Sequence, residues 1–250
     1  FKNKPKKAAF ARSRKKILER MPKIEKPPVE DYHMFTGALK PSVRSAKWVL
    51  EAEHLQIGYD KTLLELSLRV RRGQKIGIIG PNGAGKTTAF NMITGVYTPT
   101  EGEIMFNGTR TSGKKSYQVT QLGMARTFQN IRLFSELSVI DNVKIAYNMH
   151  VKYTLGEAIA RVGRYFSEED EITKKALELL KIFKLEDKAY ETAKNLPYGE
   201  QRRLEIARAL ATEPKLLLLD EPAAGMNPQE TKELMEMIRW IRDKFSLSIL

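Results

Sequence analysis

The sequence contains no cysteine among its 250 residues. That absence excludes disulfide bonds and thiolate metal sites, and it agrees only weakly with a reducing cytosol. Long apolar runs are absent too, since no stretch approaches the roughly 20 residues that a membrane-spanning helix needs. We therefore expect any membrane role to be peripheral or to pass through separate subunits. A signal peptide is missing as well, and the chain starts at Phe1 rather than at methionine, so we expect both ends to be cut.

Basic charge is concentrated in the first 47 residues. They contain 14 Lys and Arg against 4 Asp and Glu, and so carry +10 of the formal net charge of +13. Residues 5–20 have the apolar spacing of a helix, and the prolines over residues 21–46 indicate an extended linker. Two interpretations of this basic arm, residues 1–47, stay open: contact with RNA or another anionic surface, or a solvated helix end and linker.

A glycine-rich loop gives the clearest chemical signal. Residues 80–88 read GPNGAGKTT and match G-x-x-x-x-G-K-[ST], between an apolar segment at 75–79 that predicts a buried strand and a helix predicted from Thr88. In such a P-loop the backbone N–H groups surround phosphates, Lys86 reaches the β- and γ-phosphates, and the Thr87 hydroxyl binds Mg²⁺. Because two further motifs follow downstream, we reject the alternative that this loop is a glycine-rich turn that matches the pattern by chance. The predicted nucleotide-binding residues are Gly80, Pro81, Asn82, Gly83, Ala84, Gly85, Lys86, Thr87 and Thr88.

Two adjacent carboxylates follow a run of four leucines. Residues 216–222 read LLLLDEP, which predicts a buried parallel strand with Asp220 and Glu221 at its carboxyl end, where ligands bind in α/β sheets. Beside a P-loop, Asp220 can hold Mg²⁺ through water, and Glu221 can orient or deprotonate an attacking water. Alone, the pair could be an exposed acidic turn after a core strand. Together with the P-loop it favours nucleotide hydrolysis.

The remaining patterns predict an α/β domain with a helical insertion. Strands are predicted at residues 48–52, 64–70, 75–79, 103–106, 215–219 and 246–250, with a strand end at 125–129. Helices are predicted at residues 141–150, 155–166, 170–184, 199–211 and 229–245.

A third motif, LPYGEQ at residues 196–201, lies between the P-loop and the two carboxylates. With it, the chain resembles the nucleotide-binding domain of an ATP-binding cassette (ABC) protein. The resemblance implies an α/β P-loop NTPase core of ABC type, with an antiparallel β-subdomain and an inserted helical subdomain at about residues 131–198. The domain would span residues 48–250 and be truncated at its C-terminus. ATP and Mg²⁺ would be its cofactors, and a second such domain would pair with it head-to-tail around two nucleotides.

The resemblance also implies roles for single residues. Tyr59 lies where the family stacks an aromatic ring on adenine. Gln129 matches the glutamine that contacts Mg²⁺ and the attacking water and that senses the transmembrane partner. The implied catalytic residues are Glu221 and Gln129, and the implied metal ligands are Thr87, Gln129 and Asp220. The implied signature loop, which contacts the second subunit's ATP, consists of Leu196, Pro197, Tyr198, Gly199 and Glu200.

The chain departs from the family pattern in three places. Pro197 replaces the signature serine and so lacks both a hydroxyl and an N–H group. Asn227 lies where the family usually has an aspartate that couples the two sites. The family's switch histidine would follow the strand predicted from residue 246, and the histidines present cannot replace it by position; they are His33, His54 and His150.

Two branches of the family are similar to different parts of the chain. The branched-chain amino acid importers resemble the stretches FNMITGVYTPTEGEI, GMARTFQNIRLFSELSVIDNV and YGEQRRLEIARALATEPKLLLLDEPAAGMNP, all after the P-loop. The linker and second-domain start of an ABC-F translation factor resemble ARSRKKILERMPKIEKPP and VLEAEHLQIGYDKTLLELSLRVRRGQKIGIIG, which precede it. The P-loop itself is nearly identical in both families.

Three functions follow, of which we favour the first. It is the ATPase that energises import of branched-chain amino acids, peripheral on the inner face of the plasma membrane and bound to separate transmembrane permease subunits. The alternative is a soluble ABC-F type ATPase that contacts RNA or the ribosome through residues 1–47. Residues 222–227 read PAAGMN where an ABC-F protein is expected to have Pro-Thr-Asn-His-Leu-Asp, which weighs against that alternative. A P-loop protein with neither role is the third.

Overall fold

The structure, a computed structural model, describes residues 45–58, 62–81 and 83–250. All of them belong to one compact unit, Thr36–Leu250. The predictions for residues 1–44 of the basic arm, for Tyr59 and for Asn82 lie outside the described residues.

An antiparallel sheet of order β2-β1-β3-β4 comes first. Its strands are β1 (Trp48–Gly58), β2 (Thr62–Arg71), β3 (Glu103–Phe106) and β4 (Thr109–Arg110). Between β3 and β4, Asn107 and Gly108 have φ values of 51° and 78°, the left-handed backbone that a two-residue hairpin requires and that Asn-Gly adopts readily. The antiparallel pairing that the resemblance implies is confirmed.

A parallel sheet of order β5-β6-β7 carries the carboxylates. It consists of β5 (Met124–Arg126), β6 (Leu216–Leu218) and β7 (Ser248–Ile249). The helix α2 (Lys86–Ile93) packs against both sheets, because one hydrophobic cluster joins Leu50 of β1, Phe90 and Ile93 of α2, and Leu216 and Leu218 of β6. The core therefore holds the P-loop helix next to the strand that precedes Asp220 and Glu221.

The prediction of a buried strand at residues 75–79 is wrong. These residues form a single bridge, from Lys75 to Ile249, and the Ile79 side chain is 97% exposed. Its pairing with β7 consists of two hydrogen bonds: the Ile76 N–H donates to Ile249 O and the Ile249 N–H donates to Gln74 O, both at 3.0 Å. The segment beyond Ile76 continues without a ladder.

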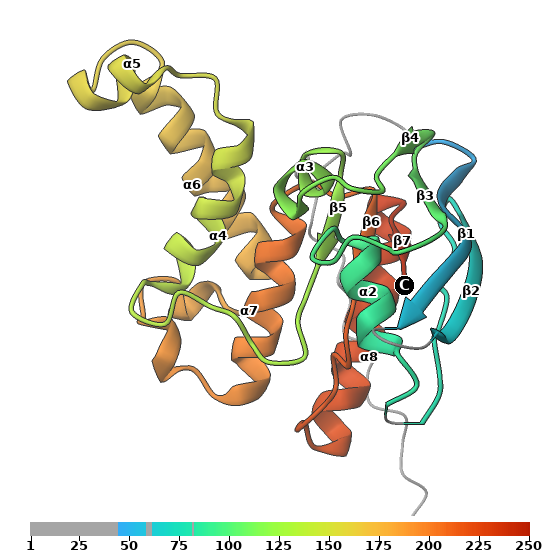
Figure 1. Cartoon of the computed structure of the whole chain (residues 1–250). Helices are drawn as coiled ribbons and strands as arrows, with labels where there is room; N and C mark the ends of the chain where they lie inside the picture. The colour runs from blue at the N-terminus through green and yellow to red at the C-terminus, as the bar shows by residue number, and fades with distance from the viewer. Residues whose placement is uncertain (1–44, 59–61, 82) are drawn as a thin grey trace, which may run out of the picture. The chain divides into compact units, whose positions relative to one another are not determined.

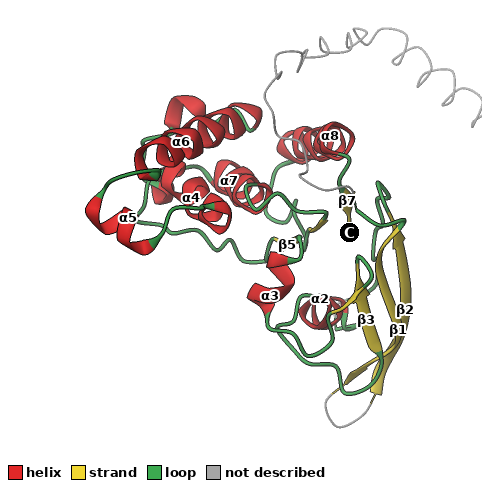
Figure 2. Cartoon of the chain, turned by 90° about the horizontal axis from the view of Figure 1, so that it is seen from above, coloured by secondary structure: helices red, strands yellow, loops and turns green. Residues whose placement is uncertain are grey.

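The other helices lie beside the parallel sheet or on the side of the domain away from the antiparallel sheet (Figures 1 and 2). They are α3 (Ser116–Gln121), α4 (Val139–Tyr147), α5 (Leu155–Ala160), α6 (Tyr165–Ile182), α7 (Tyr198–Leu210) and α8 (Pro228–Phe245), with 3-10 turns η1 (Asn148–His150), η2 (Glu186–Lys188) and η3 (Ala193–Asn195). The helix predicted over residues 155–166 is shorter, because Arg161 and Gly163 adopt positive φ values of 51° and 61° and end it. Within the described ranges, no helix has the length and apolarity to cross a bilayer.

Candidate functional site

The P-loop bends sharply into α2. Gly85 caps this helix at φ 81°, a conformation that favours glycine, and Gly83 has φ 83°. Since the cap residue has no side chain, no side chain occupies the N–H groups of the first turn, which carry the positive end of the helix dipole. The Lys86 Nζ lies over the loop and donates to Gly80 O at 2.6 Å and to Pro81 O at 2.9 Å. The loop therefore gathers positive charge and N–H donors, the groups that a phosphate chain requires.

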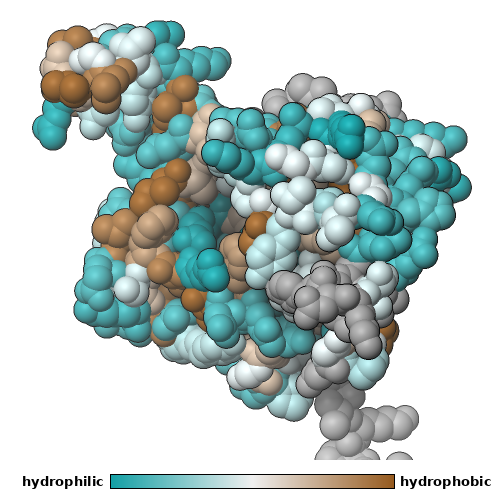
Figure 3. Space-filling view, in the orientation of Figure 1, coloured by the Kyte–Doolittle hydropathy of each residue, from teal (hydrophilic) through white to brown (hydrophobic). Residues whose placement is uncertain are grey.

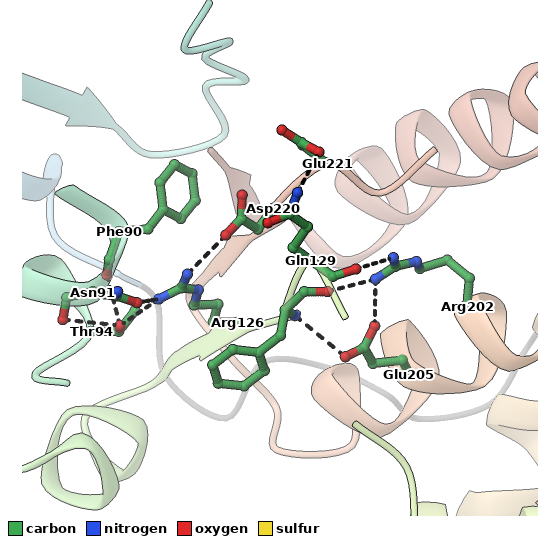
Figure 4. Close-up of polar contacts among 10 residues, drawn as sticks. Phe90, Asn91, Thr94, Arg126, Gln129, Arg202, Glu205, Asp220 and Glu221 are labelled. Atoms are coloured by element: carbon green, nitrogen blue, oxygen red, sulfur yellow. Dashed lines mark hydrogen bonds and ion pairs between the residues drawn. The ribbon is translucent and has the colours of Figure 1, made fainter. Parts of the chain in front are cut away.

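The Asp220 carboxylate lies buried beside the end of α2 (Figure 4). Its Oδ2 accepts from Arg126 Nη2 at 2.9 Å, and the two side chains are 8% and 5% exposed. Arg126 also donates from Nη1 to Asn91 Oδ1 at 2.7 Å and to Thr94 Oγ1 at 3.3 Å, both on α2 or at its C-cap. No hydrogen bond joins Thr87 to Asp220 among the described residues. Asp220 is thus tied to the P-loop helix through Arg126.

Sequence reasoning missed Arg126. Its guanidinium lies over the rings of Phe90 and Phe128, with centroid distances of 5.5 and 5.0 Å, so it also connects α2 to the segment after β5. The sequence nevertheless contains a signal for this residue. An arginine at the end of a short strand, three residues before Gln129, needs an acidic partner when it is buried.

The Gln129 and Glu221 side chains meet at the carboxyl end of the parallel sheet. Gln129 Nε2 donates to Glu221 Oε2 at 3.1 Å, and both residues are exposed. Glu221 has a φ of 47°, an uncommon conformation for a residue with a side chain and one that concentrates at functional sites. The structure therefore brings together two side chains that are 92 residues apart in the sequence.

The described residues contain no group of three or more His, Cys, Asp and Glu side chains that could hold a metal. The oxygen-bearing side chains of Thr87, Gln129 and Asp220 are a hydroxyl, an amide and a carboxylate, which are hard ligands of the kind that Mg²⁺ takes. Mg²⁺ usually retains waters and binds through one or two carboxylates together with substrate phosphates, so this donor set fits it.

The signature residues lie at the start of α7. Leu196 is buried, Pro197 is the N-cap, and Tyr198 is 45% exposed. Glu200 is paired with Lys188, whose Nζ lies 2.7 Å from Oε2. In the part of the chain that the structure describes, no hydrogen bond or ion pair joins residues 196–200 to residues 80–88.

The signature instead touches the loop that follows Glu221 and the first turn of α8. A Cβ atom on Gly199 would lie 3.0 Å from Glu230 Oε1, and one on Gly225 would lie 3.1 Å from Tyr198 Cε1. Asn227 caps α8, since its Oδ1 accepts from the Glu230 N–H at 2.9 Å. A buried pair on α7, Arg202 and Glu205, was also missed, because charges on a helix more often indicate a solvated face.

Comparisons with known proteins agree with this geometry. The family model described as ABC transporter matches residues 63–224. The "High-affinity branched-chain amino acid transport ATP-binding protein LivG" of Salmonella typhimurium is 43% identical over 185 residues, which cover 74% of this chain and 72% of that protein.

Solved structures agree as well. The ADP conformation of MJ1267, described as an ATP-binding cassette of an ABC transporter, has a TM-score of 0.69 and 28% identity, covering 82% of this chain and 80% of that one. The dimeric, post-hydrolysis structure of the ATP-binding cassette MJ0796, bound to ADP and Pi, has a TM-score of 0.67 and 25% identity, covering 80% and 85%. These relatives give no support to ribosome contact through residues 1–47. The chain belongs to the ABC transporter family, and the predicted P-loop NTPase fold of an ATP-binding cassette is confirmed.

Proposed function

We propose that this chain binds and hydrolyses ATP to energise an ABC importer of branched-chain, hydrophobic amino acids. The observation that carries the ATPase role is the hydrogen bond between Gln129 and Glu221 at the carboxyl end of the sheet, beside the P-loop helix. The substrate class is supported by the 43% identity to a protein named for branched-chain amino acid transport.

The P-loop and the first turn of α2 would hold the phosphates of ATP. Lys86 would exchange its contacts with the Gly80 and Pro81 carbonyls for phosphate oxygens, which are stronger partners because they are charged. Thr87, Gln129 and Asp220 would hold Mg²⁺, directly or through water. Bound MgATP supplies the phosphoanhydride bond that water cleaves. The other residues that we propose for nucleotide contact are Tyr59, Asn82, Gly83, Ala84, Gly85 and Thr88.

Glu221 is the proposed general base. Its carboxylate is exposed, and its Oε2 already accepts one hydrogen bond from Gln129, so the carboxamide orients the carboxylate and leaves Oε1 for a water proton. Gln129 thereby combines two proposed roles, orienting the base and contacting the metal. Both depend on the position of its backbone.

The signature loop would complete the ATP site of a second subunit. Its residues make no hydrogen bond or ion pair with the described part of this chain's own P-loop, while Tyr198 at its centre is half exposed. A head-to-tail pair of cassettes would place each signature loop on the other subunit's nucleotide. The proposed contact residues are Leu196, Pro197, Tyr198, Gly199 and Glu200.

Separate permease subunits would bind beside the Gln129 segment. A hollow of about 310 Å³ lies there, with Phe134, Ile145, Glu205 and Arg208 in its lining. Figure 3 shows the surface hollowed between the helical side of the domain and the sheets. Phe134 is 47% exposed and Ile145 38% exposed, so the rim offers apolar surface to a membrane subunit. The protein would then be peripheral on the inner face of the plasma membrane.

We also propose a division of the chain into an arm and a nucleotide-binding domain. Residues 1–47 would be an arm outside the nucleotide-binding domain of residues 48–250, and the helical subdomain would span about residues 131–198. The packing of α4 against α6 and α7 supports a helical unit in that region.

Reconstitution tests the proposal. The chain is purified from membranes with its bound permease subunits and placed in proteoliposomes that contain ATP. We expect ATP-dependent leucine uptake, and Glu221→Gln as the matched control should retain the subunits but abolish uptake. Recovery of the chain with ribosomes and without membrane subunits would contradict the proposal.

A further inference from the structure

Two oppositely charged side chains lie fully buried on α7. Arg202 and Glu205 are 0% and 2% exposed, and Arg202 Nη1 lies 2.8 Å from Glu205 Oε2. Neither residue belongs to the nucleotide site proposed above. A buried ion pair often stabilises a fold no better than apolar side chains of the same volume would, so stability alone does not explain this one.

The pair binds the main chain on both sides of Gln129. Arg202 donates from Nη1 to Phe128 O at 2.7 Å and from Nη2 to Gln129 O at 2.8 Å. Glu205 Oε1 accepts from the N–H groups of Phe128 and Arg132, both at 3.3 Å. Four main-chain groups of residues 128–132, the Gln129 loop, are therefore held by one charged pair. Figure 4 shows the bonds of Arg202 and Glu205 to the main chain at Gln129 and the residue before it.

The Gln129 loop has left the sheet where the pair holds it. The Thr127 N–H still donates to Leu218 O at 2.9 Å, and the pairing of β5 with β6 ends at that point. Main-chain groups beyond the ladder need partners wherever water does not reach them. Because α7 supplies these partners, the position of the loop depends on the position of α7.

We propose that Arg202 and Glu205 are positioning residues for the proposed ATP hydrolysis: they fix the Gln129 loop so that the Gln129 carboxamide meets Glu221. The hydrogen bond between Gln129 Nε2 and Glu221 Oε2 measures 3.1 Å and lies near the upper end of the favourable range. A small displacement of the loop backbone would break it. The kinetic part of this inference rests on the proposed function, whereas the structural part does not.

The same guanidinium reaches the signature loop. Arg202 Nη2 donates to Tyr198 Oη at 3.3 Å, one helical turn earlier. The Tyr198 ring lies against Gly225, in the loop after Glu221, where φ is 77° and a Cβ would be 3.1 Å from the ring. A shift of the first turn of α7 would therefore be transmitted through Arg202 to the Gln129 loop.

The test replaces both charges at once, in Arg202→Met/Glu205→Leu, because removing one partner would leave the other charge buried and uncompensated. Amide hydrogen exchange at Phe128 and Arg132 should become about tenfold faster, since each N–H loses its acceptor. The kcat for ATP should fall by about tenfold or more while KM stays within about twofold, the pattern of a contact that acts on the chemical step. Exchange at Leu217, within β6, should not change.

Two further variants separate positioning from general damage. Lys144→Met removes a partly buried ion pair between α4 and α6, with Glu169 at 3.0 Å, that does not touch the Gln129 loop, and it should leave kcat and exchange unchanged. Arg202→Lys keeps the charge but has one nitrogen for two carbonyls. Its kcat and its amide exchange rates at Phe128 and Arg132 should therefore be intermediate between those of the wild type and the double variant.

Three results would overturn the proposal: faster exchange with an unchanged kcat, a lower kcat with unchanged exchange, and an equal loss of kcat in Lys144→Met. If the double variant does not fold, Arg202→Lys decides by the same two readouts. If the wild-type protein hydrolyses no ATP, the proposed ATPase role fails, and unchanged exchange at Phe128 and Arg132 would overturn the positioning role separately.

Discussion

Replacing Arg126 by methionine should destabilise the fold strongly. The arginine and its partner Asp220 are 5% and 8% exposed, so the substitution leaves a carboxylate in a place from which water is nearly excluded. It also removes the donors to Asn91 and Thr94 at the end of the P-loop helix. Methionine fills much of the same volume, which limits the contribution of a cavity.

The expected loss follows from this burial. An exposed ion pair contributes about 0–1 kcal/mol, whereas breaking a buried one by removing one partner costs about 3–5 kcal/mol. The free energy of unfolding of Arg126→Met should therefore fall by about 3–5 kcal/mol, a large share of the roughly 5–15 kcal/mol of an ordinary domain. Adding Asp220→Asn removes the stranded charge, so the double variant should be less destabilised than the sum of the two single ones, by about 1–3 kcal/mol.

Urea denaturation followed by the fluorescence of Trp48 and Trp240 measures these differences. The m-value should stay constant across the series if the extent of unfolding is the same. A loss below about 1 kcal/mol in Arg126→Met, or additive effects in the double variant, would refute the reasoning, because it would mean that Asp220 finds water or another partner at no cost.

Further predictions concern the site and one helix cap. Glu221→Gln should bind MgATP as the wild type does but turn it over about 10²–10⁴-fold more slowly, and unchanged turnover would place the base elsewhere. Pro197→Ser should raise ATP-dependent dimerisation or turnover, because it adds a hydroxyl donor for a charged phosphate; a neutral result in sedimentation and ATPase assays would mean that backbone N–H groups suffice. The Glu157 carboxylate accepts from the Thr154 N–H and from Arg164, which lowers its pKa to about 2, so its ¹³C carboxyl signal should titrate there and not at 4.5. The contribution of the ionised Glu157 carboxylate to folding stability is therefore complete above pH 4.5 and is lost as the pH falls through about 2.

The sequence was sufficient to predict the elements that carry the motifs. The P-loop helix, the strand of four leucines and the signature helix all appear near their predicted positions, because glycine spacing, apolar runs and helical periodicity act over short distances. The strand predicted at residues 75–79 was wrong, because an apolar run does not by itself show whether its main chain pairs with a neighbouring strand. Here the Ile76 N–H bonds to Ile249 O, and the segment continues without a ladder.

The charged contacts around the site could not be predicted from local pattern. Arg202 and Arg203 are adjacent on α7, yet Arg202 is fully buried at the Gln129 loop, whereas Arg203 retains about a fifth of its side-chain exposure. Nothing in the periodicity of α7 distinguishes them. The difference arises from the path of a segment more than 70 residues earlier, which brings main-chain carbonyls to one guanidinium.

Binding of ATP through Lys86 decides whether this domain acts as an ATP-binding cassette. A fluorescent ATP analogue is titrated with Mg²⁺ into the wild type, Lys86→Ala and, as a control, Lys232→Ala, which removes an exposed charge on α8. Lys86→Ala should bind about 10- to 150-fold more weakly, because hydrogen bonds between charged partners contribute about 1.5–3 kcal/mol, and Lys232→Ala should bind as the wild type does. Equal affinity in Lys86→Ala and the wild type would contradict the P-loop assignment and the proposed function with it.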